Sequence, residues 1–380
     1  MASCDFLIIG GGIAGASAAF ELAALGSTVL VERESQPGYH STGRSAALYS
    51  ETYGNAPVRA LTVGSRPFYD GVTRTGFSEH PVLTPRGVLV IGRDDQRASL
   101  DRAFRESGVL TPSVRLLGDV ETLKLAPMLR PNYVAGAVWE PDAMDMDVHA
   151  IHQGYLKGLR ARGGTVKTDA EVLGLTRRDG LWHAETRAGS WSAPWIVNAA
   201  GAWADAVAAL AGVAPLGLVP KRRTAIAFDP TPIPAEAGLP HWPMVCDVDE
   251  TFYFKPEGGR LLGSPADATP VEPCDVQPEE LDIALAVDRI ERASLFTVRR
   301  ISHRWAGLRT FAPDKTPVVG PDLKADGFFW LAGQGGYGIQ TAPAMARTAA
   351  GLLTSGRVPE DLTALGVSAA DLAPERLRAS

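Results

Sequence analysis

The sequence predicts an α/β fold with a second, α+β domain built on an antiparallel sheet. Short, nearly continuous apolar runs lead into glycine or alanine at Phe6–Ile9, Thr28–Val31, Trp195–Asn198 and Phe328–Ala332. Such runs suit buried parallel strands. Mixed or alternating runs suit an antiparallel sheet with one wet face. They lie at Val82–Ile91, Val134–Trp139, Thr224–Phe228, Thr251–Lys255, Leu261–Gly263 and His303–Phe311.

Because the buried runs occur near the start, the middle and the end of the chain, the first domain is predicted to be discontinuous. Residues 1–75, 145–215 and 310–380 form it, and residues 76–144 and 216–309 form the second domain. Proline-rich residues 230–240 are predicted to form a surface loop. Helices are predicted at Asp147–Arg162, Ala202–Ala211, Pro278–Ser294 and Pro343–Leu353.

The first 32 residues carry the strongest signal. An apolar strand is followed at once by the turn Gly10-x-Gly12-x-x-Gly15, a helix over Ala14–Leu25, a second apolar strand and Glu32. This order is the Rossmann-like dinucleotide-binding fingerprint. The three glycines allow the tight turn, the approach of a pyrophosphate and close helix packing, respectively. The helix N-terminus offers N–H groups to phosphates, and the carboxylate can accept hydrogen bonds from ribose hydroxyls.

Three later segments are also rich in small residues. YHSTGRSA (39–46) holds hydroxyls and Arg44, whose guanidinium suits a phosphate or a flavin edge. VNAAGAW (197–203) is explained equally well by ordinary strand-to-helix packing when it is taken alone. FFWLAGQGGYGIQT (328–341) has four glycines in six residues, which weaken an element interior and favour a backbone cradle for an electron-rich ring or an anion.

Composition excludes several classes of partner. The net charge of -6 argues against a nucleic-acid partner. The three cysteines form no metal pattern and fit a reducing compartment, and His149 and His152 lack a third ligand, so no metal is expected. The N-terminus shows no leader and no apolar run reaches a membrane span, so a cytoplasmic protein is expected.

Taken in order, these motifs resemble the FAD-dependent D-amino-acid oxidase/glycine oxidase superfamily over nearly the whole chain. The match also includes FAPDKTPVVG (311–320). Within this superfamily, the chain most resembles bacterial D-arginine dehydrogenase-type FAD-dependent D-amino acid dehydrogenases. That similarity rests on PGYHSTGRSAA (37–47), IHQGYLKG (151–158), PLGLVPKRR (215–223), WAGLR (305–309) and QGGYGIQ (334–340).

The resemblance implies an FAD-binding domain with a docked substrate domain. FAD is expected to be bound non-covalently, although His40 lies within the ring-side motif. The cofactor-binding residues that it implies are Gly10, Gly12, Ile13, Ala14, Gly15, Glu32, Arg33, Ser41, Thr42, Arg44, Ser45, Ala200, Gly201, Gly333, Gly335, Gly336, Gly338 and Ile339.

The resemblance also implies a substrate site. Arg309 and Arg223 would clamp a carboxylate, Tyr253 and Tyr53 would add hydroxyl donors and close the pocket, and Gly336 would lie beside the ring. Neighbouring side chains in a strand point opposite ways, so only one of the two adjacent arginines at 222 and 223 can face the substrate. We favour Arg223 over Arg222.

The chain departs from the D-arginine-type pattern at two positions. Val88 stands where that type carries a glutamate for the substrate guanidinium (Gly87 if the alignment shifts), and Leu48 stands where a histidine is expected. A buried guanidinium without a partner is costly. The pocket is therefore predicted to prefer apolar or uncharged side chains over arginine.

The implied reaction is oxidative deamination of a D-amino acid. Hydride passes from Cα to flavin N5, and the imino acid is hydrolysed to a keto acid and ammonia. Oxidation of a secondary amine such as sarcosine or a proline derivative is the alternative enzyme activity. The residues are also compatible with a flavin-binding protein without turnover and with a nicotinamide-dependent dehydrogenase. The electron acceptor stays open between oxygen and a quinone.

Overall fold

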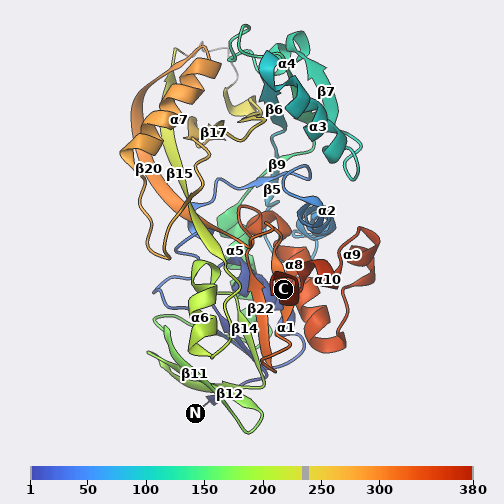
Figure 1. Ribbon diagram of the computed structural model, residues 1–380, viewed down its shortest axis with the longest axis vertical. Coiled ribbons are helices and arrows are strands. Elements are labelled where there is room, and N and C mark those ends of the chain that lie inside the picture. The colour runs from blue at the N-terminus through green and yellow to red at the C-terminus, as the bar shows by residue number, and fades with distance from the viewer. Residues whose placement is uncertain (1, 233–238, 379–380) are drawn as a thin grey trace.

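The computed structural model describes residues 2–232 and 239–378 of the 380-residue chain. A parallel sheet with flanking helices forms one end of the elongated molecule, and a larger, mostly antiparallel sheet forms the other (Figure 1). This is the mixed α/β architecture that the sequence predicts. The exact division of the chain into two domains stays a prediction.

The parallel sheet contains all four of the predicted buried strands. Its order is β10 (Thr165–Lys167), β3 (Thr28–Val31), β2 (Phe6–Ile9), β14 (Trp195–Asn198), β22 (Phe328–Ala332) and β21 (Val318–Pro321). Five strands run parallel, and β21 pairs antiparallel with β22. Their carboxyl ends therefore meet at one edge, where the glycine-rich segments begin.

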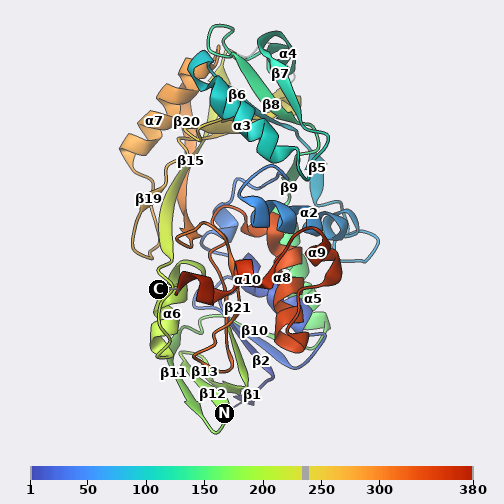
Figure 2. The same ribbon diagram turned by 45° about the vertical axis from the view of Figure 1, so that its right-hand side comes forward.

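Both faces of this sheet are covered, as continuous apolar strands require. On one face, Ile8 and Leu30 belong to an apolar core with helices α1 (Ile13–Leu22), α2 (Ala56–Asp70), α5 (Val148–Ala161) and α8 (Gly338–Ser355) (Figure 2). On the other, Leu7 and Ile9 pack with helix α6 (Ala204–Leu210) and with the strands β11 (Val172–Arg178), β12 (Leu181–Thr186) and β13 (Gly189–Ala193). The short strand β1 (Ala2–Ser3) extends this second layer.

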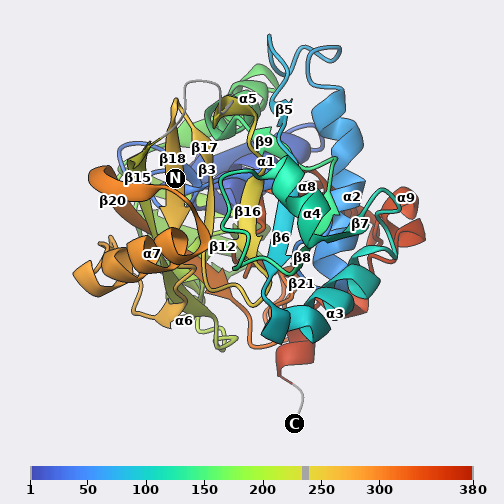
Figure 3. The same ribbon diagram turned by 90° about the horizontal axis from the view of Figure 1, so that it is seen from above.

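The larger sheet centres on one long strand pair. Strand β15 (Val219–Thr231) pairs antiparallel with β20 (Thr297–Phe311), and both are longer than predicted. The other strands are β19 (Thr269–Pro270), β18 (Arg260–Ser264), β17 (Tyr253–Glu257), β16 (Met244–Asp247), β6 (Val88–Gly92), β8 (Gly136–Glu140) and β7 (Arg115–Gly118). Helix α7 (Glu280–Ala293) and Leu123 of α4 (Asp119–Leu125) belong to the apolar core on one face of this sheet, and α3 (Arg97–Ser107) packs against Val90 and Val138 on the other face; Figure 3 shows α7 and α3 from above.

The prediction of a single strand over Val82–Ile91 is wrong, because the structure has two strands there. Its first part, β5 (Leu83–Pro85), joins β9 (Met144–Met146) and β4 (Leu48–Tyr49) in a separate small sheet, while β6 joins the large one. The break occurs at Gly87, which has φ +71° and lies under the Trp139 ring. A positive φ at glycine lets the chain turn from one sheet to the other.

The helix predictions need three corrections. Helix α1 ends at Leu22, three residues early, and a turn continues to Gly26. The predicted helix Ala202–Ala211 divides into a 3-10 turn, η3 (Gly201–Trp203), and α6. Helix α8 begins at Gly338, before the predicted start, with Pro343 inside it. The Ile339 carbonyl, which Pro343 cannot pair, accepts from the Tyr69 hydroxyl instead.

Other short elements complete the described chain. Asp147 caps α5, as predicted, by accepting from the Ala150 N–H at 2.8 Å. The helices α2, α3 and α4 and the C-terminal α9 (Glu360–Ala364) and α10 (Ala369–Leu372) were not predicted. Of the predicted loop 230–240, residues 233–238 lie outside the described residues, and β15 extends to Thr231. No helix of the described chain has the length and apolarity needed to cross a membrane.

Candidate active site

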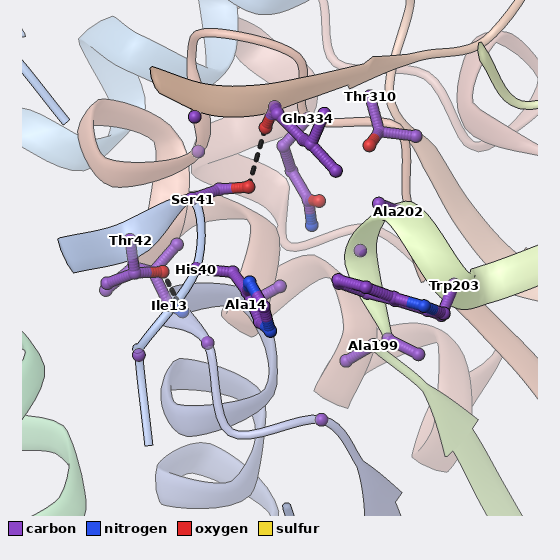
Figure 4. Close-up of a pocket in the computed structure, with 18 of the residues that line it drawn as sticks. Ile13, Ala14, His40, Ser41, Thr42, Ala199, Ala202, Trp203, Thr310 and Gln334 are labelled. Carbon is purple, nitrogen blue, oxygen red and sulfur yellow. Dashed lines mark hydrogen bonds between the residues drawn. The ribbon is translucent and has the colours of Figure 1, made fainter. Parts of the chain in front are cut away.

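A cavity of about 300 Å³ lies where the carboxyl ends of β2, β3, β14 and β22 meet the β15–β20 pair (Figure 4). Most of the predicted site residues line it. They are Gly10, Gly12, Ile13, Ala14, Glu32, Arg33, Ser41, Thr42, Arg44, Ser45, Ala200, Gly201, Gly335, Gly336, Gly338, Ile339, Arg223, Tyr253 and Arg309. Gly15, Gly333 and Tyr53 are the predicted residues that do not line it.

The glycines of the first turn bring three elements into close contact. Gly10 has φ +107°, and a Cβ there would come within 2.5 Å of the Ala199 carbonyl oxygen at the end of β14. A Cβ on Gly15 would overlap the Gly10 carbonyl oxygen. These glycines therefore let α1 and β14 pack against the end of β2 and leave bare backbone at the cavity wall.

Glu32 and Thr42 hold this turn from two sides. The Glu32 carboxylate is buried and accepts from the Gly11 N–H at 2.7 Å and from the Glu34 N–H at 2.9 Å. The Thr42 hydroxyl accepts from the Ile13 N–H at 3.0 Å (Figure 4). A carboxylate has about four acceptor sites, so Glu32 keeps acceptor capacity for a ribose.

The 41–45 segment connects the turn to the long strand β20. The Ser41 hydroxyl donates to the Leu308 carbonyl at 2.6 Å. The guanidinium of Arg44 donates to the carbonyls of Ala306 and Val276, each at 3.1 Å, and pairs with Asp275. Arg44 lines the cavity with these protein partners already in place, and its contact with a phosphate or a flavin edge stays a prediction.

Aromatic and charged side chains form the wall near the end of β3. The Arg33 guanidinium lies 4.4 Å from the centre of the Trp203 ring, and the His40 ring lies 4.7 Å from it on centroids. The Nε2 atom of His40 is 2.9 Å from Glu34 Oε1. Trp203, Val172 and Leu210 line the cavity but were not predicted as site residues. Only Trp203 had a signal, because it ends the VNAAGAW motif.

The opposite end of the cavity holds the arginine pair. In the β15–β20 ladder, Arg309 lies opposite Lys221, and Arg223 lies opposite Gly307. The two arginines are therefore diagonal neighbours on one face, a separation that long side chains can bridge. Arg309 donates to the Tyr53 hydroxyl at 3.0 Å, and the Arg223 guanidinium lies 6.0 Å from the centre of the Tyr253 ring.

Arg222 lies on the other face of β15. It is buried and paired with Asp282 at 2.9 Å and with Glu279. Arg223 instead makes one hydrogen bond to the Asp267 carbonyl at 2.7 Å. Neither Arg223 nor Arg309 has a carboxylate within 4.0 Å in residues 2–232 and 239–378. Among the described residues, the cavity therefore presents two guanidinium groups without an ion-pair partner, although the charges of Glu250 and Asp267 act on them at longer range.

Burial and neighbouring groups shift the pKa values of Tyr53 and Arg309 at the arginine end of the cavity. Burial raises the pKa of Tyr53, although the charge of Arg309 opposes this. Burial alone would lower the pKa of Arg309, but Tyr53, Tyr253, Tyr337 and Glu250 outweigh it and raise the pKa. At neutral pH, the guanidinium is thus charged and the phenol is protonated, so both can donate hydrogen bonds to an anion.

An apolar cluster surrounds Tyr253, which lines the cavity, whereas Leu48 and Val88 do not line it. Val88, Ala143, Met244 and Leu262 pack with the tyrosine, and Leu48 and Trp305 are partly buried against them. The two positions at which the chain departs from the D-arginine-type pattern, Leu48 and Val88, therefore belong to one hydrophobic group.

Comparison with known proteins places the chain in a family. The DAO family, described as FAD dependent oxidoreductase, matches residues 5–352. The chain belongs to this family. Its cofactor is FAD, and the bare backbone at Gly10 and Gly336 and the elongated cavity fit a dinucleotide with a flavin. Non-covalent attachment and the individual FAD contacts stay predictions.

The relatives include human sarcosine dehydrogenase, 27% identical over 395 residues, which cover 95% of this chain and 40% of that protein. Human dimethylglycine dehydrogenase is 26% identical over 388 residues, covering 95% of this chain and 44% of that protein. The chain thus spans less than half the length of these relatives.

Two solved structures share the fold over nearly all of both chains. L-proline dehydrogenase from P. horikoshii superposes with a TM-score of 0.85 at 21% identity, covering 99% of this chain and 98% of that one. Glycine oxidase from Geobacillus kaustophilus gives 0.83 at 20% identity, covering 97% and 99%.

Proposed function

We propose that this FAD-dependent oxidoreductase oxidises an α-amino acid whose carboxylate is bound by Arg309 and Arg223. The observation that carries the proposal is the pair of guanidinium groups at the cavity, with no carboxylate partner among the described residues. A charged group in a partly desolvated site is stabilised by an opposite charge. A planar carboxylate is the anion that matches forked guanidinium donors.

The chain contributes mainly binding and orientation. Bound FAD supplies the acceptor for a hydride from the substrate Cα. Arg309 and Arg223 fix the carboxylate, Tyr253 lines the same cavity, and Tyr53 orients Arg309 by accepting its hydrogen bond, so the position of Cα is set relative to the Gly335–Gly336 backbone. The substrate amine reacts in its neutral form, and no side-chain base is required. Water then converts the imino acid to a keto acid and ammonia.

The preferred substrate is a D-amino acid with an apolar or uncharged side chain. The preference is supported by the apolar residues that pack around Tyr253 next to the cavity, among them Val88 and Leu48 in place of a glutamate and a histidine. A substrate guanidinium there would lose its hydration without gaining a counterion. The D configuration follows from the resemblance to D-arginine dehydrogenase-type enzymes.

A secondary amine is the second candidate substrate. The names of sarcosine dehydrogenase and L-proline dehydrogenase, two of the similar proteins, favour it. Both compounds carry a carboxylate that the same arginine pair would bind. The two candidates therefore differ in the substituents on the nitrogen and on Cα, not in the anion site.

Anaerobic substrate mixing tests the proposal. The holoenzyme is mixed with D-Leu, D-Met, D-Phe and D-Arg, their L-forms, sarcosine and proline, and bleaching of the flavin absorbance is followed. Fast bleaching by apolar D-amino acids supports the first candidate, and bleaching confined to sarcosine or proline supports the second. Bleaching by neither group would contradict amino-acid oxidation. The electron acceptor, oxygen or a quinone, is then identified by reoxidation.

The Arg309→Ala variant tests the anion site separately. We expect a loss of substrate capture with FAD still bound, because Arg309 contacts Tyr53 and Gly336 at the predicted substrate end. Loss of FAD with normal substrate affinity would contradict the assignment of this residue.

A further inference from the structure

We propose that the Thr310 hydroxyl is a hydrogen-bond donor or acceptor for the flavin half of FAD. The side chain of Thr310 is only 5% exposed, and the residue lines the cavity. Its Oγ1 atom has no hydrogen-bond partner within the described part of the chain. Figure 4 shows this oxygen on the cavity side of β20.

A buried hydroxyl without a partner is costly and uncommon, and each instance needs an explanation. The other buried side-chain atoms without partners in residues 2–232 and 239–378 belong to Tyr155, Arg177, Thr348 and Arg378. None of these four residues lines the cavity. Thr310 is therefore the one that a bound ligand can reach.

The position of Thr310 selects the flavin half. The Thr310 carbonyl accepts from the Gly335 N–H at 2.8 Å, so the residue lies beside the Gly335–Gly336 turn, which is expected to approach the flavin ring. Because side chains alternate along a strand, the Thr310 side chain points to the face of β20 opposite that of Arg309. Leu308 lies on the same face as Thr310 and packs with Ala202.

Two neighbours support this location. The Gln334 side chain, like that of Thr310, projects toward the centre of the cavity, while Ile13, Ala14 and Thr42 lie across it (Figure 4). Thr310 thus lies across the cavity from the first glycine turn and beside the Gly335–Gly336 turn, where the ribityl chain and the ring are expected.

The test compares three substitutions at two buried threonines. Thr310→Val removes the hydroxyl and keeps the shape, Thr310→Ser keeps the hydroxyl, and Thr348→Val removes a buried hydroxyl without a partner from helix α8, outside the cavity lining. Each holoenzyme is diluted in steps, and the released FAD is measured by its fluorescence. Repeating the dilution with added ADP gives the affinity for the nucleotide half by competition.

We expect Thr310→Val to weaken FAD binding about 5-fold, as loss of one neutral hydrogen bond implies, and to leave ADP binding unchanged. Thr310→Ser and Thr348→Val should bind FAD like the unaltered protein. The bound-flavin absorbance bands should shift in Thr310→Val only. If FAD and ADP binding weaken equally, or if FAD binding and the spectrum are unchanged in Thr310→Val, the proposal is overturned.

These measurements need no substrate and no turnover. The inference concerns the cofactor of the family and not the amino-acid substrate. Failure of the substrate proposal would leave the Thr310 result intact, and failure of the Thr310 proposal would leave the arginine pair untouched.

Discussion

The guanidinium of Arg309 lies against the backbone of Gly336, so closely that a Cβ at this glycine would come within 2.9 Å of the arginine Cζ. Arg309, the proposed substrate anchor, and the glycine-rich turn after β22 are therefore in direct contact. Two of the four glycines in this turn are required sterically. A Cβ on Gly336 would meet Arg309, and a Cβ on Gly335 would overlap the Phe311 ring.

Gly336→Ala is expected to displace Arg309 without removing it. The added methyl group would occupy the space of the Arg309 guanidinium and disrupt the hydrogen bond that it donates to the Tyr53 hydroxyl. Because small misplacements of positioning groups cost rate steeply, kcat/KM should fall about 10- to 100-fold, mainly through KM. Steady-state kinetics measure this, and the FAD absorbance of the purified variant controls for cofactor loss. Unchanged KM would contradict the contact.

Substitution by methionine should reduce stability at Arg222 and weaken substrate binding at Arg223. Arg222→Met leaves the buried Asp282 carboxylate unpaired and should destabilise the protein by about 3 kcal/mol. Arg223→Met removes one hydrogen bond and should instead raise KM. Urea unfolding and substrate titration of both variants separate the two effects. The reverse pattern would mean that Arg222 faces the substrate.

Glu140 should make stability pH-dependent. Its buried carboxylate accepts from the Ser50 and Thr52 hydroxyls at 2.7 and 2.8 Å and from the Glu51 N–H at 2.7 Å, yet burial outweighs these bonds and raises its pKa. The folded state then binds more protons than the unfolded state, so stability from this group falls as pH rises above about 4.5 and levels off above the folded pKa.

Glu140→Gln provides the measurement, because glutamine keeps the shape and does not titrate. The unfolding free energy of the unaltered protein minus that of Glu140→Gln should decrease as pH rises from 4.5, since other carboxylates cancel in the difference. Urea unfolding at several pH values gives this difference. A difference that grows with pH would show that the hydrogen bonds outweigh burial.

Thiol alkylation should separate the three cysteines. Cys274 is exposed, whereas burial raises the pKa of Cys4 to about 11 and that of Cys246 to about 12, with Glu250 and Asp247 adding to the latter. Since the thiolate is the reactive form, iodoacetamide at pH 8 should modify only Cys274 in the native protein. Peptide mass spectrometry identifies the site, and urea-unfolded protein, with all three modified, is the control. Native labelling of Cys246 would contradict its environment.

Local patterns in the sequence predicted the parallel sheet and the first glycine turn. The strands around Gly10 depend on short-range signals, namely a continuous apolar run and a glycine turn, and these signals are sufficient where both faces of a strand are buried. The arginine pair came from the family resemblance; strand alternation predicted that Arg222 and Arg223 face opposite ways, but it could not by itself choose between them.

Long-range partners explain what the sequence could not predict. Pro343 is tolerated inside α8 because the Tyr69 hydroxyl, 270 residues away from Ile339, pairs the free carbonyl. Arg44 pairs with Asp275 and donates to the carbonyls of Val276 and Ala306, all of which are more than 200 residues away in the sequence. Thr310 belongs to no motif, and only its lack of a partner in the folded chain marks it.

The β15–β20 ladder also bears on how small molecules reach the buried centre. Paired from Val219 with Phe311 to Thr231 with Thr297, it runs from beside β14 to the far end of the molecule (Figure 1). We expect this long hydrogen-bonded strand pair to resist bending and therefore to limit relative movement of the parallel-sheet end and the antiparallel-sheet end of the molecule. Entry and exit are therefore expected to follow movements of short surface segments, such as the one that bears Tyr53, and not a wholesale swing of one half away from the other.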